Sequence, residues 1–242
     1  MIPPSDKLTS LAKKYGWKDD NLIKINLPKW DKYNLNNDSY YSKYYNSIFL
    51  LFTWREIKKG KKISPSYFKN IYQLIHNIYL REALEKNNIS LYFSLHHKID
   101  FYDKYRLLFK KYNPLAFVDE NNISKCLLKT NLVITDFSSI IFDIIYRGKP
   151  FIIYIPDAYD PNISKIYSKN YYELINSMKN GTIEFENKYF NINETINKII
   201  YYINNNFILD DNLKKFYDDL EIKKVENNTN KFINYLININ SP

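Results

Sequence analysis

The sequence predicts an α/β fold with a Rossmann-like parallel sheet, helices on both faces of that sheet and a mainly helical C-terminal part. Short, continuous apolar runs alternate with segments in which apolar residues recur at helical spacing. Ser47–Phe52, Leu132–Ile134 and Phe151–Ile155 are the clearest of the short runs. Strands that are apolar on both faces are buried on both sides, as they are in a parallel sheet covered by helices.

The predicted elements follow one another without a linker, repeat or low-complexity tract, so we expect one domain over residues 1–242. Residues 1–46 form a lead-in with a first strand at Leu22–Ile25, residues 47–157 form the α/β core, and residues 158–242 are mainly helical. Apolar residues from Tyr67 to Lys86 recur with a helical period and predict one long helix. The other predicted elements are strands at Ile89–Leu95 and Leu115–Val118, and helices at Phe101–Tyr112, Ile123–Lys129, Tyr167–Met178, Asn193–Asn205, Asn212–Leu220 and Thr229–Ile237.

Composition and charge narrow the classes of partner. With 45% hydrophobic and 25% charged residues, the chain has the composition of an ordinary folded protein. Its net charge of +9 indicates an anionic partner: a nucleotide diphosphate, an anionic lipid head group or a nucleic acid. We interpret the densest lysine run, Lys58-Lys59-Gly60-Lys61-Lys62, as a solvated loop rather than a membrane-surface patch. The codons of tyrosine and asparagine are rich in A and T, so we attribute the excess of these residues to the base composition of the genome.

Residue counts exclude several kinds of site. The chain has four glycines, and it contains neither a G-x-G-x-x-G fingerprint nor a G-K-[ST] loop. Cys126 is the only cysteine, so neither an internal disulfide nor a thiolate zinc site can form, and we expect no metal. The N-terminus lacks an apolar signal core, and no apolar run approaches the ~18 residues of a spanning helix. We expect a cytoplasmic protein, with peripheral attachment to the inner face of the cell membrane left open.

The most informative stretch is Thr135-Asp136-Phe137-Ser138-Ser139, which separates a short apolar run from a second one with helical spacing. We predict a buried strand, a tight polar loop and a helix that extends to Tyr146, with both serines in its first turn. The first N–H groups of a helix have no partner within it and bind phosphate well, and two hydroxyls add further donors. This pattern predicts a site for a donor nucleotide.

The strand at Phe151–Ile155 delivers Asp157 to the same edge of the sheet, where ligands of open α/β sheets bind. In the helix, Asp143 lies four residues beyond Ser139 and on the same face. The structural alternative is that Asp136 and the serines cap the helix, while Asp143 pairs with Arg147 at i, i+4.

Two further strand ends carry polar groups that suit a phosphate ligand. His96 follows the Ile89–Leu95 strand, and its imidazole could donate a hydrogen bond to phosphate or protonate a leaving group. Arg55 follows the Ser47–Phe52 strand within Thr53-Trp54-Arg55, and its guanidinium could hold a phosphate by a bidentate fork. Taken singly, the histidine reads as a satisfied surface residue and the arginine as part of a structural cation–aromatic pair. Three polar strand ends on one sheet edge favour a ligand site.

The order of these motifs resembles the signature of the CDP-glycerol glycerophosphotransferases, the teichoic acid polymerase family. The resemblance covers roughly residues 20 to 160 and leaves the family's pattern at four positions, where Asn26 replaces glycine, Lys29 replaces arginine, and Phe52 and His97 replace proline. The matching segments are Leu27-Pro28-Lys29-Trp30-Asp31 for G-x-P-R-x-D, Thr53-Trp54-Arg55 for P-T-W-R, Leu95-His96 for L-H-P, and Thr135–Asp143 followed by Lys149-Pro150 and Asp157.

The resemblance implies a GT-B-type architecture, of which this chain is the C-terminal, donor-binding half. It implies CDP-glycerol or a related CDP-alditol as donor substrate, a polyol-phosphate or glycan acceptor, and no cofactor. His96 is the implied catalytic residue, and Ser138 and Ser139 are implied to hold the diphosphate. The other implied substrate-binding residues are Thr53, Arg55, Thr135, Asp136, Asp143 and Asp157.

Alternatives to a complete transferase stay open at this point. The family's acceptor-binding N-terminal domain has no counterpart here, so the chain is a fragment, a subunit completed by a partner chain, or a module that binds a nucleotide without turning it over. A basic protein that binds a membrane or RNA surface is the last alternative. Because no RNA-binding motif is present, we expect no nucleic acid partner.

Overall fold

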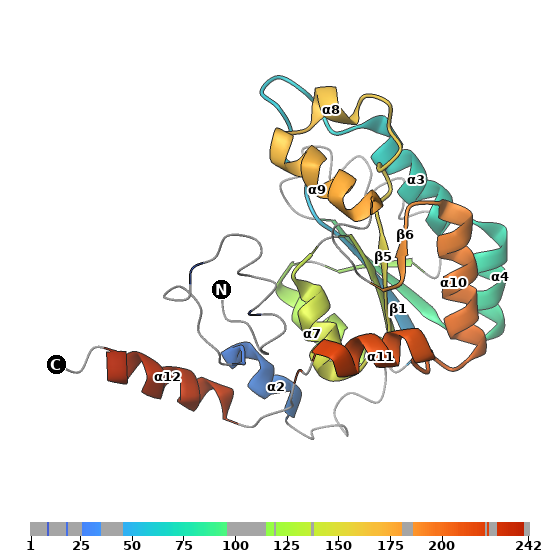
Figure 1. The fold of residues 1–242 in the computed structure, drawn as a ribbon. Coiled ribbons are helices and arrows are strands. Elements are labelled where there is room, and N and C mark those ends of the chain that lie inside the picture. Colours follow the sequence, from blue (N-terminus) through green and yellow to red (C-terminus); the bar gives the residue numbers. More distant parts are fainter. Residues whose placement is uncertain are drawn as a thin grey trace. The chain divides into compact units, whose positions relative to one another are not determined.

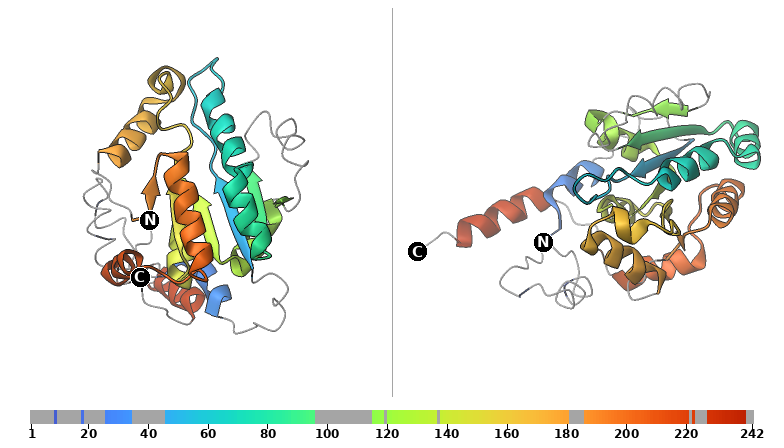
Figure 2. Two further views of the ribbon diagram at one scale, coloured as in Figure 1. Left: turned by 90° about the vertical axis from the view of Figure 1, so that its right-hand side faces the viewer. Right: turned by 90° about the horizontal axis from the view of Figure 1, so that it is seen from above.

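The computed structural model describes residues 9, 18, 26–34, 46–95, 115–118, 120–136, 138–180, 186–220, 222 and 227–239 (Figures 1 and 2). The chain forms two compact units. The larger unit comprises Lys43–Ile141 and Pro150–Ile208, and the smaller comprises Met1–Ser42, Phe142–Lys149 and Leu209–Pro242. Helix α7 (Ile140–Arg147) begins in the larger unit and ends in the smaller one.

A parallel six-stranded sheet forms the centre of the larger unit. Its strand order is β3-β2-β1-β4-β5-β6, and every neighbouring pair is parallel. In this doubly wound order the chain reverses its direction across the sheet between β1 and β4, and ligands of such sheets bind outside the carboxyl ends of the strands at that reversal. The strands are β1 (Ser47–Phe52), β2 (Ser90–Leu95), β3 (Leu115–Phe117), β4 (Leu132–Thr135), β5 (Phe151–Tyr154) and β6 (Lys188–Tyr189).

The central strands form the core of this unit because they are apolar on both faces. All residues of β1, β4 and β5 are buried. The register pairs Leu51 with Thr135 and Thr135 with Ile153, so the three strands end almost level with one another. The residues that follow β1, β4 and β5 therefore emerge at the same edge of the sheet.

Helices α3, α4 and α10 lie together on one face of the sheet (Figure 2). The segment predicted as one helix from Tyr67 to Lys86 is two helices, because the side chain of Asn77 accepts a hydrogen bond from Leu80 N and begins a new helix there. The helices of the larger unit are α3 (Pro65–Ile75), α4 (Ile78–Lys86), α6 (Ile123–Lys129), α8 (Ile163–Ile166), α9 (Lys169–Lys179) and α10 (Ile192–Asn204).

Beyond the carboxyl end of β1, residues 53–64 run beside the segment that joins β5 to α9 (Figure 1). Ile57 and Tyr167 form an antiparallel bridge. Lys58 N donates to Ile166 O at 2.9 Å, and Ser168 N donates to Glu56 O at 2.9 Å. Backbone pairing thus holds two connections together beyond the carboxyl edge of the sheet.

The smaller unit consists of segments that lie far apart in the sequence. Asp31 caps a helix near the C-terminus, because its carboxylate accepts from Asn228 N at 2.7 Å and from Thr229 N at 2.8 Å. The ring of Trp30 stacks on that of Tyr146 with centroids 4.3 Å apart. The described elements of this unit are η2 (Pro28–Trp30), α2 (Asp31–Asn34), the second part of α7, α11 (Asp211–Leu220) and α12 (Asn228–Ile239).

The structure confirms the predicted α/β fold with a Rossmann-like parallel sheet. The single domain stays a prediction; the smaller compact unit is assembled from three distant segments, and no linker in the sequence marks it. The predicted strand at Leu22–Ile25 and helix at Phe101–Tyr112 lie outside the described residues. Among the residues that the structure describes, no helix has the length and apolar character needed to cross a membrane.

Candidate functional site

The carboxyl edge of the sheet is tied together at the point where the strand order reverses. Asp136 directly follows β4, and Thr53 directly follows β1. The Asp136 carboxylate accepts hydrogen bonds from Thr53 N at 3.1 Å and from Thr53 Oγ1 at 2.9 Å. Thr135 is fully buried, and its hydroxyl donates to Leu51 O at 2.6 Å. These contacts join two adjacent strand ends and leave the side chains of both Thr135 and Asp136 facing the protein.

Arg55 is the centre of a buried ion cluster, which we call the Arg55 cluster and which consists of Arg55, Asp136 and Asp157. Its guanidinium binds Asp157 by a fork, with Nε at 3.0 Å from Oδ2 and Nη2 at 2.9 Å from Oδ1. Its Nη1 lies 2.5 Å from Asp136 Oδ2 and also donates to Thr53 O at 3.1 Å. All three charged side chains are fully buried.

Tyrosines enclose the cluster. The guanidinium carbon lies 4.3 Å from the ring centroid of Tyr67 and 5.3 Å from that of Tyr171, and cation–π attraction favours both contacts. The hydroxyl of Tyr167 donates to Asp157 Oδ2 at 2.6 Å. The tyrosine excess, which composition alone attributes to codon usage, therefore includes residues that build this edge of the sheet.

Burial and charge set the protonation of the cluster. Burial alone would lower the pKa of Arg55, but the charges of Asp157 and then Asp136 raise it well above its ordinary value. Burial raises the pKa of Asp136, and the nearby Arg55 charge opposes that rise only in part. One guanidinium thus stays charged between two carboxylates, and the charged form of Asp136 is the one that burial disfavours.

The predicted fork between Arg55 and a phosphate is therefore corrected to a fork between Arg55 and Asp157. The structural alternative, a cation–aromatic arrangement, describes Arg55 better, and its aromatic partners include Tyr67 and Tyr171. Asp136 and Asp157 are directed at the same guanidinium, so Asp136 does not cap α7. These residues hold the shape of the sheet edge, and a ligand at that edge would lie outside them.

Ser138 and Ser139 remain the ligand-facing candidates at the strand reversal. Helix α7 begins at Ile140, so both serines precede the first turn instead of lying within it. Ser138 caps the helix, with its hydroxyl 3.4 Å from Ile140 N and its carbonyl 3.2 Å from Ile141 N. Ser139 is exposed and Ser138 is partly exposed. Two hydroxyls next to the positive end of a helix form a suitable place for a phosphate.

Asp143 belongs to the smaller unit and has a different set of partners. Its Oδ1 accepts from Trp30 Nε1 at 2.6 Å, and its Oδ2 lies 2.7 Å from Lys29 Nζ. Asp143 is buried, whereas the Lys29 side chain is 47% exposed. We call Asp143, Lys29 and Trp30 the Asp143 cluster. Asp143 is thus held by Lys29 and Trp30 of the Leu27–Asp31 motif, partners that were not evident from sequence spacing. Its proposed contact with substrate stays a prediction.

His96 and His97 lie outside the described residues, so the proposed catalytic role of His96 stays a prediction. His76 ends α3 and stacks on Tyr72 with ring centroids 3.8 Å apart. Burial lowers the pKa of His76, which fits the structural role expected for it. Within the described part of the chain, no group of His, Cys, Asp and Glu residues could hold a metal ion.

Comparison with known families adds to this geometry. The sequence model of the family described as CDP-Glycerol:Poly(glycerophosphate) glycerophosphotransferase matches residues 2–220. The chain belongs to this family. The match includes all the residues predicted for the site, and it confirms the resemblance first inferred from four short motifs.

One curated relative is the minor teichoic acid biosynthesis protein GgaB of Bacillus subtilis (strain 168). It is 27% identical over 241 residues, which cover 94% of this chain and 25% of GgaB. The chain thus spans a quarter of the length of that relative.

The solved structures that resemble the fold include a teichoic acid polymerase and a UDP-GlcNAc 2-epimerase. The wall teichoic acid polymerase TagF has a TM-score of 0.50 at 18% identity, covering 98% of this chain and 57% of the TagF chain. A UDP-GlcNAc 2-epimerase from Neisseria meningitidis, solved with UDP-GlcNAc, has a TM-score of 0.53 at 12% identity, covering 97% of this chain and 60% of the epimerase. These likenesses confirm the predicted GT-B-type fold.

Proposed function

We propose that this chain is the donor-binding part of a glycerophosphotransferase that binds CDP-glycerol or a related CDP-alditol. On this proposal it transfers glycerol phosphate to a teichoic acid or another cell-surface polymer, together with an acceptor-binding part. We propose that it acts in the cytoplasm, at the inner face of the cell membrane.

Family membership over residues 2–220 is the single observation that carries the proposal. The geometry supports it in one respect: Ser138 and Ser139 stand beside the helix N-terminus at the strand reversal, where a doubly wound sheet binds its ligand. The net charge of +9 supports an anionic ligand, of which a diphosphate is one.

The proposed reaction is a phosphoryl transfer without a cofactor. The acceptor hydroxyl attacks the β-phosphorus of CDP-glycerol, the bond between that phosphorus and the bridging oxygen breaks, and CMP leaves. Ser138, Ser139 and the N-terminus of α7 stabilise the charge on the phosphoryl oxygens. His96 protonates the departing phosphate, and the acceptor's proton passes to a base of the acceptor-binding part. Arg55 acts as a positioning residue, because its charge is already neutralised by the buried carboxylates.

Calorimetric titration with CDP-glycerol, CMP and glycerol 3-phosphate tests the donor assignment. We expect the two nucleotides to bind and glycerol 3-phosphate to bind far more weakly. Replacing both Ser138 and Ser139 by alanine should weaken CDP-glycerol binding by at least about tenfold, since each lost hydrogen bond to a charged group costs about 1.5–3 kcal/mol.

A matched double variant separates binding from folding. Ser168→Ala removes a serine cap from α9, and Ser90→Ala removes an exposed serine at the amino end of β2, on the opposite edge of the sheet. This variant should lose similar stability and keep its nucleotide affinity. A folded wild-type chain that gives no binding heat with either nucleotide would contradict the proposal.

A further inference from the structure

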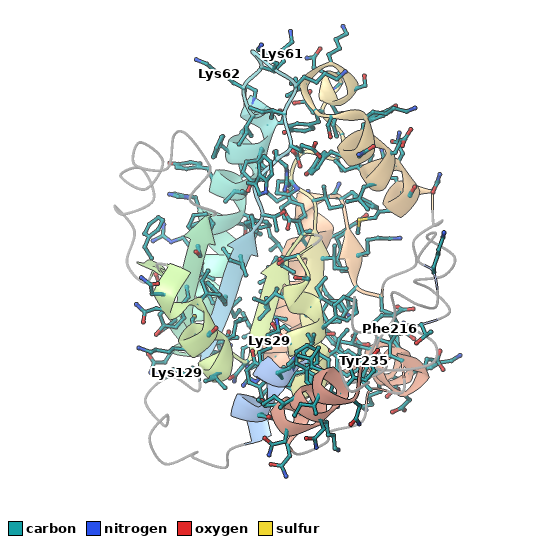
Figure 3. The ribbon with its side chains drawn as sticks, turned by 90° about the vertical axis from the view of Figure 1, so that its left-hand side faces the viewer. Lys29, Lys61, Lys62, Lys129, Phe216 and Tyr235 are labelled. Atoms are coloured by element: carbon teal, nitrogen blue, oxygen red, sulfur yellow. The ribbon has the colours of Figure 1, made fainter. Side chains whose placement is uncertain are left out.

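Four exposed lysines gather on one tight turn beyond the carboxyl end of β1. We call residues 57–63 the lysine turn; it carries Lys58, Lys59, Lys61 and Lys62. Gly60 makes the turn possible, since its φ of +76° is one that side-chain-bearing residues rarely adopt. Figure 3 shows Lys61 and Lys62 at the tip, with their side chains directed away from the protein.

The turn is held rigidly at its base. The Ile57–Tyr167 bridge pairs its first residue with the segment before α9, and Lys61 N donates to Lys58 O at 3.0 Å across the turn. On the far side, Ser64 is buried and its hydroxyl contacts the carboxylate of Asp160. The backbone of the turn is therefore held in one conformation before any ligand arrives, which lowers the backbone entropy that binding would cost.

Positive charge dominates around the turn. No acidic residue occurs from residue 57 to residue 81 or from residue 161 to residue 172. The paired segment adds Lys165 and Lys169, both exposed. Against these, Glu56 lies directly before the turn, and Glu173 lies 3.7 Å from Lys169. Six exposed lysines thus outnumber the three carboxylates nearby, which are Glu56, Glu173 and the buried Asp160 at the base of the turn.

This arrangement suits a polymer of phosphates better than a single small anion. The lysines stand on a convex turn instead of lining a buried pocket, and a single contact between exposed charges is weak and screened by salt. A chain with a phosphate in every repeat can make several such contacts at once, and their effects combine.

The turn suits a polymer better than a membrane. Amphipathic segments that lie in the membrane interface combine basic residues with apolar side chains that enter it. Between Ile57 and Ile63 the turn has only lysine and glycine, and both isoleucines are partly buried. The turn therefore offers charge without an apolar anchor.

We propose that the lysine turn is a docking surface for the polyol-phosphate acceptor of the transferase, a partner that rests on the proposed function. One residue, Glu56, separates the turn from Arg55 in the sequence. Tyr167, which pairs with the first residue of the turn, donates to Asp157 of the Arg55 cluster. The turn is thus built on the same scaffold as the strand ends where the donor is proposed to bind.

Fluorescence anisotropy with a labelled poly(glycerol phosphate) oligomer tests the proposal, without donor and at low salt. Replacing Lys58, Lys59, Lys61 and Lys62 by glutamine should weaken binding at least about tenfold, given up to roughly 1 kcal/mol for each exposed ion pair lost. Wild-type affinity should also fall steeply as ionic strength rises to about 0.15 M. The control replaces the same number of exposed lysines elsewhere by glutamine, namely Lys86, Lys125, Lys214 and Lys215.

The control has the same net charge as the test variant, so a general charge effect would weaken both variants alike. If the lysine turn is the docking surface, the control should keep wild-type affinity to within about threefold. Equal losses in both variants would overturn the docking surface and leave a general charge effect. Binding to anionic phospholipid vesicles that depends on the turn, with no binding of the oligomer, would overturn it in favour of a membrane contact. The test variant should bind CDP-glycerol as tightly as wild type does. If wild type itself does not bind CDP-glycerol, the proposed function is contradicted, while the measured binding of the poly(glycerol phosphate) oligomer to the turn is unaffected.

Discussion

The Arg55 cluster and the Asp143 cluster both contain residues of the sequence motifs, but the first has one cation for two carboxylates and the second has one carboxylate for two donors. In the Arg55 cluster, one guanidinium is shared by Asp136 and Asp157, and all three side chains are fully buried. In the Asp143 cluster, one carboxylate is shared by an indole N–H and by Lys29, whose side chain is 47% exposed.

The difference shows at which motif residue water can take over the contacts of a removed side chain. Removing the guanidinium would leave two carboxylates buried without a counterion, and the protein has no way to hydrate them. Removing the Lys29 amine would leave Asp143 with its indole partner, and water can reach the position that the amine occupied. A motif arginine can therefore be required for the shape of a site that it does not line.

The largest expected effect is from Arg55→Met. Because it leaves two buried carboxylates without their cation, we expect the free energy of unfolding to fall by about 3–5 kcal/mol, measured by urea denaturation at pH 7. Adding Asp136→Asn and Asp157→Asn to this variant should restore part of the loss. A loss below about 1 kcal/mol for Arg55→Met would mean that the guanidinium is solvated, as a ligand-facing arginine would be.

An intermediate effect is expected from Asp143→Ala. The substitution leaves the buried indole N–H of Trp30 without an acceptor, which costs about 1–3 kcal/mol. Lys29→Met removes only the exposed ion pair and should cost less than about 1 kcal/mol. Chemical denaturation gives the free energy of unfolding of both variants, and we expect the larger loss for Asp143→Ala. If Lys29→Met were as damaging as Asp143→Ala, the ion pair and not the indole contact would hold this cluster.

The smallest expected effect is a pH dependence at the base of the lysine turn. Burial would raise the pKa of Asp160, but hydrogen bonds led by that from Ser64 lower it below its ordinary value of 3.8. Because the pKa of Asp160 is lower in the folded protein, its carboxylate contributes its full stabilisation above pH 3.8. That stabilisation is lost as the pH falls through the lowered pKa of the folded protein.

Ser64→Ala should therefore destabilise the protein more at pH 7 than in acid. We expect the loss to shrink by about 1 kcal/mol between pH 7 and pH 2, the difference between hydrogen bonds to charged and to neutral acceptors. Ser168→Ala is the control, because it removes a serine cap whose hydroxyl accepts from a backbone N–H, that of Tyr171. Urea denaturation at both pH values gives the comparison. Equal losses from Ser64→Ala at the two pH values would show that Asp160 is not its partner.

The central strands could be predicted from the sequence because their burial is written in consecutive residues. Ser47–Phe52 has the bounds expected from its apolar run, and the carboxyl ends of β4 and β5 were expected within one residue. The division between α3 and α4 could not be predicted from periodicity, because the apolar period continues past Asn77 while the side chain of Asn77 caps a new helix.

The partners of the charged motif residues could not be predicted, since they depend on strand order. Arg55 meets Asp136 and Asp157 across separations of 81 and 102 residues, and Trp30 meets Asp143 across 113. The sequence placed the first three residues at one sheet edge correctly, but it could not distinguish a guanidinium that faces a ligand from one that faces two carboxylates.

A crystal structure of the chain with CDP-glycerol tests the central claim most directly. We predict that the diphosphate oxygens lie within hydrogen-bond distance of Ser138 and Ser139, while the guanidinium of Arg55 stays on Asp136 and Asp157. A diphosphate bound by Arg55, with either carboxylate released from it, would contradict the account.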